Sequence, residues 1–287
     1  QQRIWIATFE GGINYLERNT DKENVKFINY KNRLKNYPIS QCYRTRFVTS
    51  DHEGRIWIGS ATGLLMCDGD FSEAERIVFH RYCRIPGDIQ SLSNNDVHNI
   101  FFTQDKKMYV GTFGGGLNKL LSIDHGQARF RAYTMKDGLP SDVLLSIEED
   151  KKGNLWCATE EELYRFNPDS EKFINYPSRV FPRQVNFNEG AALCTQSGYL
   201  MYNTIKGILY FLPDSINTSN YIPPIIFTSL QQAEKTVSPS ERGILTTHID
   251  DTQLLKLPHD KNSFSIQFAA LDMKYPDNIS YSYQLEG

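Results

Sequence analysis

The chain has 287 residues, of which 40% are hydrophobic and 13% aromatic, enough for the core of one large domain or two smaller ones. Its net charge of −3, without a basic patch, argues against general affinity for nucleic acid, and no apolar run is long enough to cross a bilayer. The many tyrosines and phenylalanines (16 and 17) favour β structure.

One motif recurs along the first two thirds of the chain. RIWIATFEGGINYL at residues 3–16 returns as RIWIGSATGLLM at 55–66, KMYVGTFGGGLNKL at 107–120, NLWCATEEELYRF at 154–166 and, more weakly, YLMYNTIKGILYF at 199–211. Aligned on Trp5, Trp57, Tyr109, Trp156 and Met201, the units are spaced by 52, 52, 47 and 45 residues. Such regular spacing indicates a repeat array. The chain begins inside the first motif, without an initiator Met, so we expect it to be a piece of a longer protein.

Each unit is predicted to hold four short β-strands. An apolar strand comes first, as at 45–50, and a turn with Asp and Gly follows, as in DHEG at 51–54; in the third unit Lys106 and Lys107 are expected to shorten this turn. The aromatic strand, a Gly-rich bend and a second short strand come next, and a last strand carries an aromatic pair, as in FRAY at 130–133. Four antiparallel strands in 45 to 52 residues, without an amphipathic helix, predict an all-β chain of β-propeller blades.

The repeated residues are predicted to have structural roles. A packing residue has reason to recur in each blade and a ligand contact has not, so Trp5, Trp57, Tyr109 and Trp156 are expected to pack between blades. We call these aromatic residues the anchors. The Thr or Ser three residues after each anchor is expected to form a hydrogen bond within a turn. Gly114 to Gly116 do not form a phosphate loop, because the pattern is not GxGxxG and no helix follows.

No catalytic or metal site is predicted. The five cysteines are odd in number and form no CxxC pair, the six histidines lack metal-ligand spacing, and no Ser-His-Asp set can be assembled. Cys157 is expected to be a small buried apolar side chain. The acidic runs 148–150 and 160–162 are expected to be solvated hairpin turns. We therefore predict no cofactor and no metal.

The units resemble the two-component regulator propeller repeat, in which a turn is followed by LWIGT and then by GGLNRY or GLYRY. PGDIQSLSNNDV at 86–97 and DGLPSDV at 137–143 are similar to the segments between its blades. The repeats stop after Leu212, and the residues from 262 to 287 resemble the first half of the YYY module, an Ig-like β-sandwich that follows such propellers. The resemblance thus implies blades over 1–212, about five of an expected seven, and a linker with part of a YYY module over 213–287. In that part, Phe264, Ile266 and Phe268, and likewise Tyr281, Tyr283 and Leu285, are expected to alternate with outward residues in a half-buried sheet.

Blades followed by a YYY module imply the periplasmic sensor of a bacterial hybrid two-component system. Such sensors bind oligosaccharides released from polysaccharides and signal through the YYY module and a transmembrane helix to a cytoplasmic histidine kinase. The fragment itself would not be an enzyme, would reach the membrane only through a missing C-terminal part, and could pair as a homodimer. Two alternatives stay open, a propeller-fold carbohydrate-active enzyme (lyase or glycosidase) and a protein-interaction propeller. The enzyme would need paired carboxylates or a His cluster.

Positions that break the repeat are the candidates for ligand contact. Arg46 and His98 each lie eleven residues before an anchor, on the predicted innermost strand; Arg44 lies one step further out, and Asn99 is next to His98. We expect these four residues near one mouth of the central channel, where Arg, His and Asn commonly hold sugars, acidic ones in particular. The competing interpretation is that they line a solvated pore.

Overall fold

The computed structural model describes residues 3–17, 26–177, 181, 185–216, 223–232, 235–241, 243–257, 259, 263–271, 279 and 281–284. The chain divides into two compact units, Gln1–Ile216 and Asn217–Gly287, a division close to the boundary expected after residue 212. Within the described ranges, no helix is long and apolar enough to cross a membrane.

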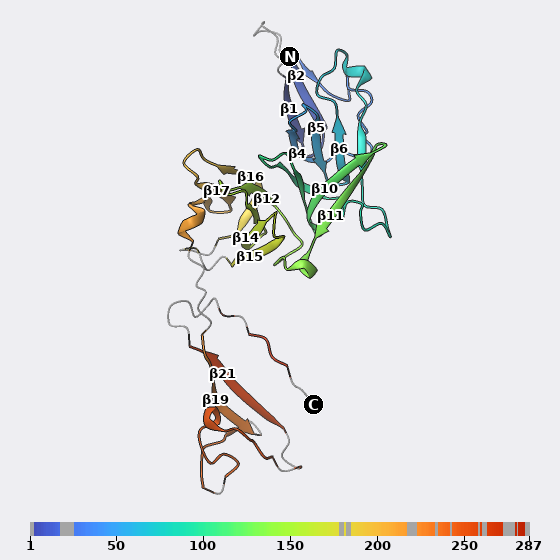
Figure 1. Cartoon of the computed structure of the whole chain (residues 1–287). Helices are drawn as coiled ribbons and strands as arrows, with labels where there is room; N and C mark the ends of the chain where they lie inside the picture. Colours follow the sequence, from blue (N-terminus) through green and yellow to red (C-terminus); the bar gives the residue numbers. More distant parts are fainter. Residues whose placement is uncertain are drawn as a thin grey trace. The chain divides into compact units, whose positions relative to one another are not determined.

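Among its described residues, the first unit has five antiparallel sheets, each made of strands that follow one another in the sequence (Figure 1). The strands are, sheet by sheet, β1 (Arg3–Thr8), β2 (Gly12–Glu17) and β3 (Phe27–Ile28); β4 (Thr45–Ser50), β5 (Ile56–Ser60), β6 (Gly63–Cys67) and β7 (His80–Tyr82); β8 (Val97–Phe102), β9 (Met108–Thr112), β10 (Gly116–Asp124) and β11 (Gln127–Tyr133); β12 (Ser146–Glu149), β13 (Leu155–Ala158), β14 (Glu162–Asn167) and β15 (Lys172–Pro177); β16 (Phe187–Cys194), β17 (Leu200–Thr204) and β18 (Gly207–Phe211). The prediction of an all-β chain with four-stranded propeller blades is confirmed. The first and fifth sheets have three strands among the described residues.

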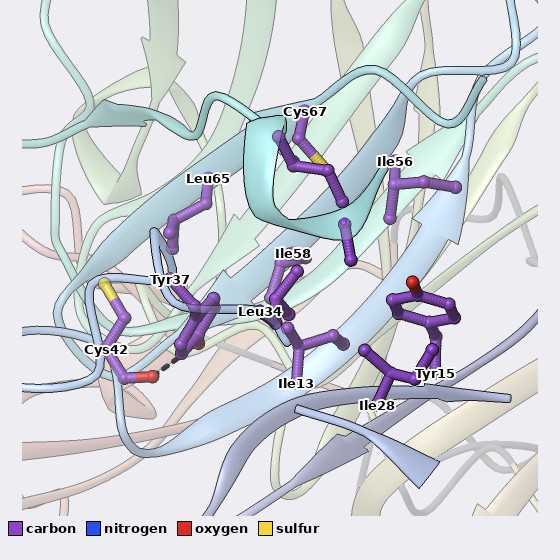
Figure 2. Packing of buried hydrophobic residues seen from close by; sticks show 12 residues of the cluster. Ile13, Tyr15, Ile28, Leu34, Tyr37, Cys42, Ile56, Ile58, Leu65 and Cys67 are labelled. Atoms are coloured by element: carbon purple, nitrogen blue, oxygen red, sulfur yellow. Dashed lines mark hydrogen bonds between the residues drawn. The ribbon is translucent and has the colours of Figure 1, made fainter. Parts of the chain in front are cut away.

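Each anchor lies in a core that its blade shares with the next. Trp57 packs with residues of β8 and β9, Tyr109 with residues of β12 and β13, and Trp156 with residues of β16 and β17. All three side chains are fully buried, whereas Trp5 is partly buried against another core. Residues of β2 and β5 contribute to that core, among them Ile13, Tyr15, Ile56 and Ile58 (Figure 2). Burial of a large apolar side chain contributes about 1.5–3 kcal/mol, so these residues hold neighbouring sheets together.

A buried aspartate six residues before each Trp in the second and fourth blades fixes the preceding turn. Oδ2 of Asp51 accepts a hydrogen bond from Nε1 of Trp57 at 2.8 Å, and Oδ2 of Asp150 accepts one from Nε1 of Trp156 at 2.8 Å. Oδ1 of each carboxylate accepts two backbone N–H bonds from its own turn. The Asp-x-x-Gly-x-x-Trp pattern therefore reflects a set of hydrogen bonds through which the Asp carboxylate joins the turn to the anchor, which we call the turn clamp.

The third turn keeps its length, so the expectation that Lys106 and Lys107 shorten it is wrong. Thr103 replaces the aspartate, and its Oγ1 accepts the backbone N–H of Lys107 at 2.9 Å. Lys106 has the left-handed φ of 67° that glycine supplies in the other turns, with 83° at Gly54 and 78° at Gly153. The turn needs one left-handed residue and one side-chain acceptor, and a residue other than glycine can take the first place.

The hydroxyl three residues after each anchor closes the following hairpin, which confirms its predicted role. The hydroxyls of Thr8, Ser60, Thr112 and Thr159 donate to the carbonyls of Gly12, Gly63, Gly116 and Glu162 at 2.8, 2.7, 3.2 and 3.0 Å. In the weakest unit, Thr204 donates to Gly207 in the same way at 2.8 Å. This bond identifies the fifth unit as a blade although its aromatic anchor is replaced by Met201.

The acidic residues at 148–150 are not a solvated surface, contrary to the prediction. Glu148 and Glu149 belong to β12, and Asp150 is buried. Burial raises the pKa of Glu148 to about 7 and also raises that of Glu149, although Glu149 accepts the backbone N–H of Gln104 at 2.8 Å. The cause is the position of β12, which contacts both β8 and β16. The second acidic run, 160–162, is at a hairpin with exposed or partly exposed residues, as predicted.

The second unit contains a small antiparallel sheet in the order β20-β19-β21. Its strands are β19 (Ile225–Gln232), β20 (Lys235–Thr236) and β21 (Phe264–Ala270). Leu230, Leu245 and Ile249 form its buried core. β21 lies where the first strand of the Ig-like module was expected.

The expected alternation of buried and exposed residues does not hold in this unit. Ile266 packs against the core, but Phe264 and Phe268 are 44% and 36% exposed. Residues 281–284 are not in a strand, so Tyr281 and Tyr283 differ from the prediction, and Leu285 lies outside the described residues. Tyr281 instead contacts the ring of Phe268 at a centroid distance of 5.2 Å. The apolar pattern located β21 but not its buried face.

Candidate functional site

The innermost strands of successive blades lie side by side. β4 contacts β8, β8 contacts β12, and β12 contacts β16. These four strands line one cavity, which we call the channel, and each continues into the turn that precedes its anchor. The first residues of the strands therefore meet at one end of the channel and the turns at the other.

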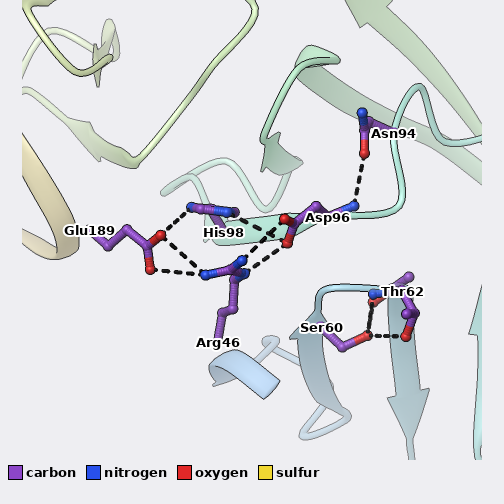
Figure 3. A network of polar contacts seen from close by, with 8 residues as sticks. Arg46, Ser60, Thr62, Asn94, Asp96, His98 and Glu189 are labelled. Atoms are coloured by element: carbon purple, nitrogen blue, oxygen red, sulfur yellow. Dashed lines mark hydrogen bonds and ion pairs between the residues drawn. The ribbon is translucent and has the colours of Figure 1, made fainter. Parts of the chain in front are cut away.

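A β-bulge interrupts three of these strands near their first residues. The ladder between β4 and β5 shifts register at Arg46, the ladder between β8 and β9 shifts at His98, and the ladder between β16 and β17 shifts across a stretch that includes Glu189. A bulge re-aims a side chain relative to the regular alternation of a strand. Here bulges on three different blades direct three polar side chains toward one another (Figure 3).

Arg46 lies at the centre of this cluster. Its Nε and Nη2 donate to the two carboxylate oxygens of Asp96 at 2.7 and 3.1 Å, and its Nη1 donates to both oxygens of Glu189 at 3.1 and 3.2 Å. His98 lies between the same two carboxylates, with Nε2 at 3.5 Å from Asp96 and Nδ1 at 3.3 Å from Glu189. Two carboxylates thus enclose one guanidinium and one imidazole.

The electrostatics of the cluster follow from these contacts. Burial alone would raise the pKa of Asp96, but the neighbouring His98 and the hydrogen bonds and charge of Arg46 hold it below its usual value. Asp96 is therefore a carboxylate at neutral pH, and a bidentate pair of this kind is stronger than a neutral hydrogen bond. Asp96 and Glu189 together contribute two carboxylates, against the one guanidinium of Arg46.

Exposed aromatic rings flank the cluster on both sides. Phe9 is 51% exposed and lies 5.5 Å from the guanidinium carbons of both Arg44 and Arg46, while Tyr43 lies 5.2 Å from that of Arg44. On the other side Phe113 is 42% exposed and stacks on His98 at a centroid distance of 5.2 Å. We call the residues Phe9, Tyr43, Arg44, Arg46, Asp96, His98, Phe113 and Glu189 the channel mouth.

The four predicted ligand residues do not all belong to the channel mouth. Arg44, Arg46 and His98 do, and Arg46 and His98 share the same two partners. Asn99 is buried in the channel wall, where its Oδ1 has no hydrogen-bond partner. It lines a cavity of about 490 Å³ along β4, β8 and β12, together with Glu148. The structure separates Asn99 from the other three.

Four residues of the channel mouth were not predicted from the sequence as ligand contacts. Asp96 is the next-to-last residue of the segment that was interpreted as an inter-blade connection. Glu189 precedes the weakest anchor by twelve residues, outside any strand that the motif predicted. Phe9 and Phe113 each follow the hairpin Thr inside the repeat. The signal for these two was present, because the residue at this position varies from blade to blade: Phe9, Ala61, Phe113, Glu160 and Ile205.

The chemistry available at the channel mouth is hydrogen bonding and stacking. Charged donors and acceptors are fixed by their mutual contacts, and exposed rings stand beside them. In the part of the chain that the structure describes, no group of three or more His, Cys, Asp or Glu side chains is arranged to hold a metal ion. The His98 side chain is almost completely covered. A ligand would therefore meet mainly Phe9, Phe113, Arg44 and the open side of Glu189.

Comparison with known proteins relates these blades to signalling proteins. A curated protein of Formosa agariphila named Histidine kinase P4 is 24% identical over 99% of this chain, and the chain spans 20% of that protein's length. Among solved structures, the extracellular domain of a hybrid two component system from B. thetaiotaomicron is 21% identical with a TM-score of 0.40, covering 94% of this chain and 45% of that one. Virginiamycin B lyase from Staphylococcus aureus is 16% identical with a TM-score of 0.41, covering 64% of this chain and 59% of that one.

A family model matches one blade directly. Residues 138–161 match the model described as two component regulator propeller. The matched segment contains β12, the turn clamp of Asp150 with Trp156, and β13. The fourth blade therefore carries a two component regulator propeller repeat.

Proposed function

We propose that this chain is the ligand-sensing part of a two-component receptor, acts outside the cytoplasm, and binds an oligosaccharide at the channel mouth. The observation that carries the proposal is the cluster of Arg46, Asp96, His98 and Glu189 between the exposed rings of Phe9 and Phe113. The match of residues 138–161 to the regulator propeller model and the likeness to Histidine kinase P4 support the receptor role.

The channel mouth suits a sugar because a sugar ring has an apolar face and a rim of hydroxyls. An exposed aromatic ring can cover the apolar face, as Phe9 and Phe113 would do. Hydroxyl groups both donate and accept, so they can use the free lone pairs of a carboxylate and the N–H groups of a guanidinium at the same time. Arg44, which is exposed beside Phe9, would supply the donors.

Binding alone does not transmit a signal, since the ligand must favour one arrangement of the receptor over another. We propose that the second unit, as the start of a YYY module, relays the bound state toward a membrane-spanning segment and a histidine kinase in the whole protein, with pairing of two ectodomains as part of the switch. The chain would act without catalysis and without a cofactor.

Isothermal titration calorimetry with a panel of polysaccharide fragments tests the proposal. We expect one class of fragment to bind, and Phe113→Ala and Arg44→Ala each to weaken that binding at least tenfold without loss of the β-sheet circular dichroism signal. Ile89→Ala, at a strongly exposed residue in the connection between β7 and β8, is the control and should bind like the unchanged chain. Equal affinity for all three variants would refute the channel mouth as the site.

One observation favours an enzyme as the second candidate. Asp96 and Glu189 place two carboxylates from different blades on either side of His98, a pairing that the sequence did not reveal. Against it, both carboxylates are bonded to Arg46, and the pKa of Asp96 is lowered, so Asp96 is a poor proton donor at neutral pH. Incubation of the panel with the chain, followed by chromatography of the products, separates the two: cleavage that disappears in Asp96→Asn would support the enzyme.

A further inference from the structure

We infer that the channel mouth selects uncharged oligosaccharides over those that carry carboxylate or sulfate groups. This inference rests on the proposed function and specifies its ligand class. From the sequence alone, Arg44, Arg46 and His98 favour an acidic sugar, because three basic side chains converge. The contacts around them lead to the opposite preference.

The guanidinium of Arg46 is already paired on each of its nitrogens. Nε and Nη2 are bound to Asp96, and Nη1 is bound to both oxygens of Glu189. Four of its five N–H donors are engaged in this way, so an anionic ligand group would find a single Nη2 N–H unless it displaced one of these carboxylates. A carboxylate left in this partly buried place without its partner would be strongly disfavoured. Arg46 therefore serves to hold the acceptors in position.

The acceptors, in turn, face the ligand with negative charge. Glu189 is 50% exposed, so its carboxylate remains open on the side away from Arg46. A carboxylate accepts hydrogen bonds through several lone pairs, and hydroxyl groups of a neutral sugar can donate to those not used by Arg46. A sulfate or uronate at the same place would instead meet a like charge at short range.

The hairpins around the channel mouth add no net positive charge, because their one basic residue, Lys206, is outnumbered by Glu10, Glu160 and Glu161. The residue that follows the hairpin hydroxyl is Phe9, Ala61, Phe113, Glu160 and Ile205 in the five blades, which gives four uncharged residues and one acidic residue. Arg44 is the single exposed cation among the channel-mouth residues, and it is balanced by the excess negative charge of the cluster. The two arginines and the two carboxylates of the channel mouth thus balance in formal charge.

Calorimetry with two sets of fragments tests this inference. One set comes from neutral polysaccharides (laminarin, mannan and xylan) and the other from anionic ones (alginate, polygalacturonate and carrageenan). We expect binding in the neutral set alone, with an affinity that changes less than twofold between 50 and 500 mM NaCl. Binding in the anionic set alone, or an affinity that falls tenfold or more with salt, would overturn the inference and leave the sensor function standing. Binding in neither set would overturn the proposed function, and the inference with it.

A charge-neutral variant gives an independent measurement. Glu189→Gln removes one negative charge and leaves Arg46 Nη1 with one acceptor oxygen instead of two. We therefore expect it to weaken binding of the neutral fragment severalfold and to bind an anionic fragment at least tenfold more tightly than the unchanged chain does. Asp68→Asn, at an exposed residue after β6 at the other end of the blade, is the matched control and should leave both affinities unchanged. Glu189→Gln with an unchanged preference between the two sets would contradict the inference, provided that circular dichroism shows it folded.

Discussion

Replacement of Asp150 by alanine should destabilise the first unit by about 3 kcal/mol. In the folded chain, Oδ2 accepts Nε1 of Trp156 at 2.8 Å, and Oδ1 accepts the backbone N–H groups of Lys152 and Asn154 at 2.8 and 3.0 Å. The indole and the Asn154 N–H are buried and could not turn to bulk water when the carboxylate is removed. Each buried donor left without a partner costs about 1–3 kcal/mol. The release of a buried carboxylate offsets part of this loss, which leaves the estimate near 3 kcal/mol.

Urea unfolding followed by far-ultraviolet circular dichroism measures this change. Asp169→Ala is the control, because Asp169 is an exposed acidic residue in a turn of the same blade, and its free energy of unfolding should stay within about 0.5 kcal/mol of the unchanged chain. Asp51→Ala should reproduce the loss in the second blade, where the same clamp holds Trp57. If Asp150→Ala is no less stable than Asp169→Ala, the clamp does not stabilise the blade and this explanation of the repeated motif is wrong.

Two further changes test other parts of the fold. Burial raises the pKa of Glu148 to about 7, so between about pH 4.5 and 7 the folded chain keeps this proton while the unfolded chain loses it, and stability should fall as pH rises through that window. Glu148→Gln should remove this dependence and raise the free energy of unfolding by up to about 3 kcal/mol at pH 8. Urea unfolding at several pH values measures both effects, and an unchanged slope of stability against pH in the variant would contradict the argument. Gly116→Ala should lower the free energy of unfolding by at least about 2 kcal/mol, because its φ is 69° and the added Cβ would lie 2.1 Å from the carbonyl oxygen of Tyr133. Gly126→Ala, with a φ of 80° and open space around it, should lower it by only about 1 kcal/mol. Equal midpoints of the two variants in thermal unfolding would refute the steric part of this argument.

The blades could be predicted from the sequence because the physics that forms them is local and repeated. A Trp mid-strand, an Asp six residues earlier and a hydroxyl three residues later are all held by contacts within one blade or with the next blade. Each such contact requires a particular residue type at a fixed distance along the sequence from the anchor, so it can be recognised when the units are aligned. The fifth blade was recognisable for the same reason, although Met201 replaces its aromatic anchor.

The proposed binding site could be predicted only in part, because it depends on contacts between distant blades. Arg46 and His98 stood out as polar residues in an apolar strand, but their common partner Glu189 is 143 residues from Arg46 in the sequence, and no repeat links the two. The sequence alone therefore showed three basic side chains and missed the two carboxylates, Asp96 and Glu189, that pair with Arg46. The acidic run at 148–150 was misjudged for a related reason, since its burial comes from β8 and β16 on either side of β12.

The most direct test of the central claim, that the channel mouth binds the ligand, is hydrogen–deuterium exchange of the chain with and without a saturating oligosaccharide. We predict slower exchange in peptides that contain residues 43–46, 96–98 and 113–116, and no change at the turns 51–54 and 150–153, which lie at the other end of the channel. Protection confined to those turns, or to the second unit, would contradict the assignment of the channel mouth as the ligand site.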